Sequence, residues 1–68
     1  MTKVIYKRNI RQEDFLDSDE LIFYKNNNIA FIIIKKDNNY FVRKKKVFNN
    51  QLLEERTVKT IPQVLKIL

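Results

Sequence analysis

The chain has 68 residues, which is one domain at most, and so short a chain buries only about 60% of the surface that its unfolded form exposes. It contains no cysteine and no histidine, which excludes a disulfide framework, thiolate chemistry and the usual pairs of nucleophile and base. Its net charge of +6 favours association with an anionic partner.

Residues 1–19 are expected to be irregular, or to form a short strand followed by a helical turn. Lys3 to Lys7 is a candidate fifth strand, and Gln12 to Leu16 is long enough for one helical turn. A dense acidic run follows, comprising Glu13, Asp14, Asp17, Asp19 and Glu20. Its spacing matches no calcium loop, so a solvated acidic turn is favoured over a metal site, and no cofactor is predicted.

Asparagine marks the turns of the next segment. The chain has no glycine, and Asn and Asp are the other residues that best tolerate positive φ in tight turns. They cluster at 26–28, 37–39 and 49–50, between runs rich in Ile, Phe, Tyr and Val. This pattern predicts an antiparallel β-meander over residues 20–59, with strands at 21–25, 29–36, 40–48 and 51–59.

The first hairpin of this meander has a specific expected register. A two-residue turn at Asp37-Asn38 places Ile34 opposite Phe41, which pairs apolar side chains on one face. The same turn places Ile33 opposite Val42 on the other face. Residues 29–34 are apolar at consecutive positions, which predicts a central strand covered on both faces.

The second hairpin is expected to turn at Asn49-Asn50. A two-residue turn there places Lys45 opposite Glu54 and Lys44 opposite Glu55, so that opposite charges face each other. It also places Phe41 opposite Val58.

Residues 60–68 are predicted to form a short helix packed on the sheet. Thr60 is a suitable N-cap, Gln63 completes a capping box, and Pro62 fits the first turn. Ile67 and Leu68 extend the apolar stripe and are candidates for a homodimer contact. The whole chain, residues 1–68, is therefore expected to be a single α+β domain, with a small SH3-like or barrel-like sheet as the alternative.

A basic stretch on the middle strands is the strongest functional signal. Lysine and arginine residues lie on both sides of the first hairpin, beside two aromatic residues, and this combination is typical of single-stranded nucleic-acid platforms. The predicted binding residues are Lys35, Lys36, Tyr40, Phe41, Arg43, Lys44, Lys45 and Lys46. The competing interpretation is a solvated strand whose lysines protect a sheet edge and whose charges Glu54 and Glu55 neutralise.

These features predict a small, basic, non-enzymatic protein that binds nucleic acid or a nucleoprotein. The alternative is an inhibitor or adaptor of the kind that phage or mobile elements encode, acting on a larger protein partner. No catalytic residue is predicted. The longest apolar run, residues 29–34, is far shorter than the roughly 20 residues of a membrane-spanning helix, so no membrane contact is expected and the location is predicted to be cytoplasmic.

Overall fold

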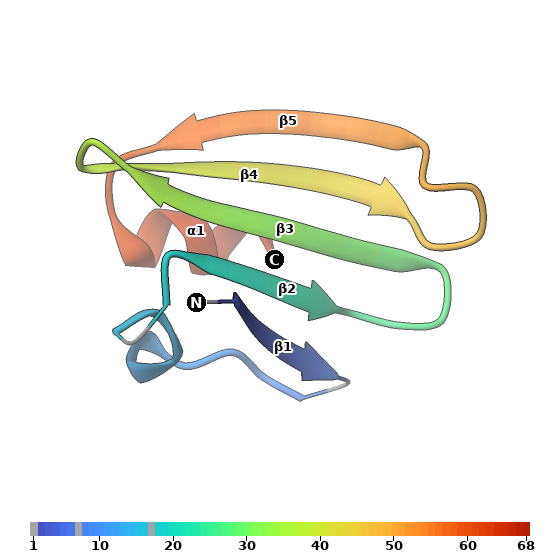
Figure 1. Ribbon diagram of the computed structural model, residues 1–68, viewed down its shortest axis with the longest axis horizontal. Coiled ribbons are helices and arrows are strands. Elements are labelled where there is room, and N and C mark those ends of the chain that lie inside the picture. Colours follow the sequence, from blue (N-terminus) through green and yellow to red (C-terminus); the bar gives the residue numbers. More distant parts are fainter. Residues whose placement is uncertain (1, 7, 17) are drawn as a thin grey trace.

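The computed structural model describes residues 2–6, 8–16 and 18–68 of the protein. These residues form a five-stranded sheet, a 3-10 turn and a C-terminal helix (Figure 1). The strands follow one another across the sheet in chain order, so β1 and β5 are its two edges. The elements are β1 (Thr2–Tyr6), η1 (Gln12–Phe15), β2 (Glu20–Tyr24), β3 (Ile29–Lys36), β4 (Asn39–Lys46), β5 (Leu52–Val58) and α1 (Ile61–Ile67).

The sheet is mixed, which corrects the expectation of a purely antiparallel meander. The fifth strand exists at the N-terminus, but β1 runs parallel to β2, with Thr2 opposite Glu20 and Tyr6 opposite Tyr24. Parallel neighbours need a crossover of about a dozen residues or more, and the segment between Tyr6 and Glu20, which includes η1, provides it. Lys7, at the end of the strand expected there, lies outside the described residues.

The first predicted hairpin is confirmed. Strands β3 and β4 are antiparallel, with Ile34 opposite Phe41 and Ile33 opposite Val42. The turn residues Asp37 and Asn38 have φ values of 53° and 66°, the left-handed conformation that a two-residue hairpin turn requires at both central positions.

The predicted register of the second hairpin is wrong. The closing hydrogen bond runs from the Lys46 amide to the Gln51 carbonyl, so the loop spans residues 47–50 rather than 49–50 alone. A β-bulge then inserts Leu53 as an extra residue on β5. The longer loop shifts the register by two residues, so that Lys45 pairs with Leu52. Beyond the bulge the shift is only one residue, which places Lys44 opposite Glu54 and Arg43 opposite Glu55.

The C-terminal helix begins as its sequence predicts. The Thr60 hydroxyl accepts a hydrogen bond from the Gln63 amide, and the Gln63 side chain accepts one from the Thr60 amide. Val64 is completely buried, and Ile67 and Leu68 pack half-buried against the core. Ile67 and Leu68 at the end of the helix therefore make contacts within the chain.

The core lies on one face of the sheet, called here the covered face. Helix α1 and η1 pack on this face, and α1 lies behind the sheet in Figure 1. The core comprises Ile5, Phe15, Leu21, Phe23, Phe31, Ile33, Tyr40, Val42 and Val64. The expectation that β3 is covered on both faces is wrong: Ile32 and Ile34, which point to the other face, are only half-buried.

The architecture is thus α+β, with an open sheet and a helix on one side. Among the described residues the strands pair only with their chain neighbours, so the sheet does not close between β1 and β5 as a barrel would. The helix of the described chain is too short to cross a membrane.

Candidate functional site

The face opposite the core, called here the open face, contains three cross-strand rows of side chains that span all five strands. Paired residues on neighbouring strands share a face, so the register defines each row. The first row is Thr2, Glu20, Ile34, Phe41 and Thr57. The second row is Val4, Ile22, Ile32, Arg43 and Glu55. The third row is Tyr6, Tyr24, Ala30, Lys45 and Leu52.

The basic strand β4 divides its predicted binding residues between the two faces. Phe41, Arg43 and Lys45 belong to the open face, because they pair with the open-face residues of β3. Lys44 and Lys46 alternate with them and point to the other side.

The ring of Tyr40 lies in the core. Its side chain is on the covered face and the residue is only 8% exposed. The ring packs edge-on against Phe15, with the ring centroids 6.1 Å apart. Of the two aromatic residues predicted to stack on a ligand, only Phe41 lies on the open face, where it is half-buried.

The lysines at the end of β3 also divide. Lys36 pairs with Asn39 and belongs to the open side, whereas Lys35 pairs with Tyr40 on the covered side. Both side chains are exposed beside the hairpin turn. The structure therefore brings together Lys36, Phe41, Arg43 and Lys45 on one face and places Lys35, Lys44 and Lys46 on the other.

The glutamates of β5 contact arginines rather than lysines. The Glu54 carboxylate accepts a hydrogen bond of 2.6 Å from Arg56, its neighbour on the same strand. The Glu55 carboxylate lies 3.6 Å from the Arg43 guanidinium across the sheet. Lysines 35, 36, 44, 45 and 46 make no ion pair with the described residues, so their ammonium groups are available to a partner.

Two open-face aromatic residues were not predicted as part of the site. Tyr6 on β1 and Tyr24 on β2 stack face to face, with centroids 4.9 Å apart and ring planes 4° apart. Tyr6 is 65% exposed. The sequence does not show this pair because it depends on the parallel pairing of β1, although Tyr6 already lies within the candidate strand of residues 3–7.

The middle of the open face is apolar. Val4, at the β1 edge, is 45% exposed, and Ile22 and Ile32 beside it are half-buried. No helix of the described chain is seen to pack over this row in the way that α1 packs over the core, and the loop before β5 borders it through Val47 and Asn50. An apolar centre beside basic and aromatic residues is an arrangement that binding surfaces use.

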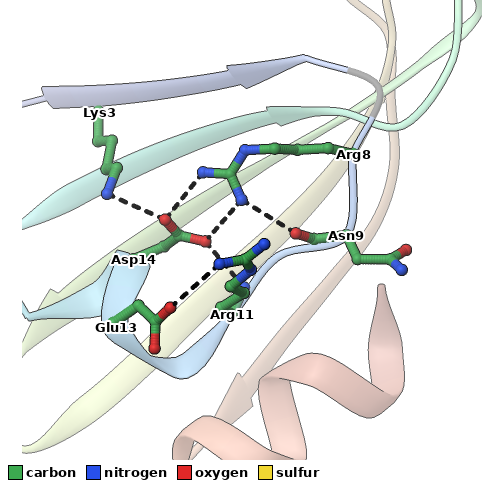
Figure 2. Close-up of polar contacts among 6 residues, drawn as sticks. All are labelled: Lys3, Arg8, Asn9, Arg11, Glu13 and Asp14. Carbon is green, nitrogen blue, oxygen red and sulfur yellow. Dashed lines mark hydrogen bonds and ion pairs between the residues drawn. The ribbon is translucent and has the colours of Figure 1, made fainter.

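The acidic run predicted as a solvated turn contains a buried carboxylate. Asp14 is 4% exposed and lies at the centre of a cluster of cations (Figure 2). Arg8 donates two hydrogen bonds to it, of 2.9 and 3.2 Å, and the Lys3 ammonium lies 3.0 Å from Oδ1. The Arg11 amide donates a further hydrogen bond of 2.8 Å to Oδ2.

These contacts lower the pKa of Asp14 well below its usual range. The hydrogen bonds from Arg8 have the largest effect, burial opposes them, and the Arg11 amide and Lys3 add to the lowering. The cluster ties β1, η1 and the segment between them together. Because its lone pairs are already taken by these donors, the Asp14 carboxylate is a structural anchor rather than a candidate ligand or base.

The other acidic residues do not converge. Glu13 is exposed and forms an ion pair of 3.6 Å with Arg11, and Glu20 accepts a hydrogen bond from Thr2. Asp17 lies outside the described residues, and within them no group of three or more acidic side chains is placed to hold a metal ion.

The chain matches no protein-family model, no curated protein and no solved structure. The geometry of the open face and the charges around it are therefore the features that bear on function.

Proposed function

We propose that the protein is a non-enzymatic binding protein that holds nucleic acid, alone or within a nucleoprotein, on the open face of its sheet. The observation that carries this proposal is the gathering of Phe41, Arg43 and Lys45 with the Tyr6–Tyr24 pair on the one face that no helix covers.

The charges support a polyanionic ligand. The lysines of β3 and β4 make no ion pair with the described residues, while the nearby glutamates are engaged by Arg43 and Arg56. Phosphate groups attract such free ammonium groups, and the release of counterions from the nucleic acid makes the binding salt-dependent. Lysines on both faces contribute to long-range attraction, and those of the open face are placed to contact the bound strand.

The aromatic residues support a single strand rather than a duplex. Tyr6, Tyr24 and Phe41 stand on a broad sheet surface, and unpaired bases stack on such rings regardless of their sequence. In a duplex the base faces are covered by their neighbours, which leaves the rings without a stacking partner. The expected preference is therefore for single-stranded DNA or RNA.

The experiment is a fluorescence-anisotropy titration of labelled single-stranded and duplex oligonucleotides with the purified protein. We expect micromolar or tighter binding of the single strand, weaker binding of the duplex, and a steep loss of affinity between about 50 and 200 mM salt. The absence of binding to either oligonucleotide at the lower salt concentration would overturn the proposal.

The apolar centre of the open face favours a second candidate, an inhibitor or adaptor that binds a larger protein. Val4, Ile22 and Ile32 would form the apolar centre of an interface with Arg43 and Lys45 at its rim. Such an interface depends less on salt than phosphate contacts do. A stable complex with one acidic protein that persists at moderate salt, without binding to oligonucleotides, would favour this candidate.

A further inference from the structure

The third row of the open face contains a gap in a line of large side chains. From the β1 edge inward its members are Tyr6, Tyr24, Ala30 and Lys45. Three of these side chains are long and the alanine carries only a methyl group. The row therefore dips at β3, between the Tyr24 ring and the Lys45 side chain.

This dip is part of a hollow on the open face, called here the Ala30 slot. Its volume is about 130 Å³, and strand residues on its lining include Ile22, Tyr24, Ala30, Ile32 and Lys45, while Lys46 and the loop residues Val47 and Asn50 border it at the end of β4. Small-molecule pockets usually measure roughly 300–1,000 Å³, so the slot is suited to one flat ring rather than to a whole ligand.

The stacked tyrosines define the orientation of such a ring. Neighbouring strands lie about 4.8 Å apart. The Tyr6 and Tyr24 centroids are 4.9 Å apart and their planes nearly parallel, so the two rings are stacked across the strands, one strand spacing apart. One face of the Tyr24 ring is covered by Tyr6 and its other face is turned toward the next strand, where Ala30 lies.

From this geometry we infer that the Ala30 slot takes one nucleobase of a bound single strand, which continues the Tyr6–Tyr24 stack as its third ring. The base stands over the Ala30 methyl with one face on Tyr24. Lys45 lies on the other side, where its ammonium reaches the adjacent phosphate. This inference rests on the proposed function, because it specifies where on the open face the strand places a base.

Ala30 is 8% exposed, which shows that neighbouring side chains close over most of the slot floor. Lys45 lines the slot, has a long side chain with several rotatable bonds, and makes no ion pair with the described residues. The base enters as the Lys45 side chain turns away from Ala30 toward the phosphate. The tyrosine pair need not move, since its rings already have the required orientation.

The test uses the Ala30 methyl resonance in the intact protein as the reporter. An aromatic ring placed over a methyl group shifts its proton resonance upfield. We expect this shift on titration with a single-stranded oligonucleotide, and no shift with an oligonucleotide of equal charge whose bases are replaced by abasic sites. The abasic oligonucleotide should still bind, with a similar dependence on salt.

Three variants give an independent measurement by anisotropy. Ala30→Leu fills the slot and should weaken binding of the single strand by about fivefold to a hundredfold, the effect of losing one stacked base. Thr57→Leu adds bulk to the same face at the exposed β5 edge and should leave binding within about twofold. Tyr24→Leu keeps an apolar side chain but removes the ring, and should reproduce the loss seen with Ala30→Leu.

The outcomes separate this inference from the function on which it rests. Salt-dependent binding without a shift of the Ala30 methyl, and with no loss in Ala30→Leu, would overturn the slot and leave the proposed function standing. Failure of the wild-type protein to bind any oligonucleotide would overturn both. An upfield shift with a free nucleoside monophosphate, but not with the oligonucleotide, would assign the slot to mononucleotides and contradict its use by a strand.

Discussion

Both faces of the central strand β3 carry isoleucines, but the two faces of the sheet differ in what lies over them. On β3, Ile33 lies on the covered face and is 2% exposed, while its neighbour Ile32 is half-buried on the open face. On β4, Val42 is in the core and Phe41 and Arg43 are on the open side. The difference shows that alternation assigns residues to faces, whereas only the position of α1 and η1 decides which face is the core.

This comparison separates stability from binding. The covered face holds the residues whose burial drives folding, and the open face holds apolar and aromatic residues that retain part of their contact with water. A surface of that kind is stabilised further when a partner covers it. The changes described next test the separation, from the largest expected effect to the smallest.

Adjacent isoleucines on opposite faces provide the most direct stability test. Ile33→Ala removes buried methyl groups and should lower the free energy of unfolding by about 2–5 kcal/mol. Ile32→Ala, one residue earlier, should lower it by about 1 kcal/mol because its side chain is only half-buried. Urea denaturation followed by circular dichroism measures both. Equal losses would contradict a core confined to one face.

The Asp14 cluster should account for a smaller part of the stability. Asp14→Asn removes the charge that Arg8, Lys3 and the Arg11 amide contact, and should lower the free energy of unfolding by about 2 kcal/mol. Glu13→Gln is the matched control, because its ion pair with Arg11 is exposed and should contribute less than about 1 kcal/mol. If Glu13→Gln lowered the free energy of unfolding as much as Asp14→Asn does, burial of the Asp14 carboxylate would have no special role in stability.

The same carboxylate predicts how stability depends on pH. The folded state lowers the pKa of Asp14, so in acid the unfolded state takes up the proton first. The stabilisation is present above the unfolded pKa of about 3.9 and is lost as the pH falls through the folded value. Between pH 6 and pH 3, the free energy of unfolding measured by urea titration should therefore fall more in the wild type than in Asp14→Asn. The same difference in both proteins would contradict the assignment.

The smallest expected effect is that of a change in the turn between β3 and β4, which belongs to neither face of the sheet. Asn38 has a φ of 66°, and Asn38→Gly removes the strain of a left-handed residue, so the protein should gain up to about 1 kcal/mol in thermal denaturation. Asn39→Gly is the control, because Asn39 lies within β4 and glycine weakens a strand. Oligonucleotide binding by Asn38→Gly should equal that of the wild type, and a change would show that stability and binding are not separable.

Local signals made a large part of this fold predictable. The Asp37-Asn38 turn follows from the tolerance of Asp and Asn for positive φ, and the register of β3 and β4 follows from that turn. The capping box of Thr60 and Gln63 marked the start of α1 in the same way. Each of these features depends on residues close together in the sequence.

The remaining features depend on contacts that no local pattern specifies. The bulge at Leu53 and the four-residue loop before β5 changed the partners of Glu54 and Glu55. The parallel pairing of β1 created the Tyr6–Tyr24 stack, and the approach of Lys3 and Arg8 from outside η1 buried the Asp14 carboxylate. The basic residues of the candidate site were visible in the sequence, but their division between two faces required the position of the helix.

The central claim is that the open face binds a nucleic-acid strand, and two neighbouring lysines test it most directly. Lys45 lies on the open face and Lys44 on the covered side, both are half-buried, and neither makes an ion pair with the described residues. The measurement is the affinity of Lys45→Gln and of Lys44→Gln for a single-stranded oligonucleotide over a range of salt concentrations. We predict that Lys45→Gln lowers the slope of log affinity against log salt by about 0.7, the value for one lost phosphate contact, while Lys44→Gln leaves it nearly unchanged. Equal slopes for the two variants, or a larger reduction in Lys44→Gln, would contradict the claim.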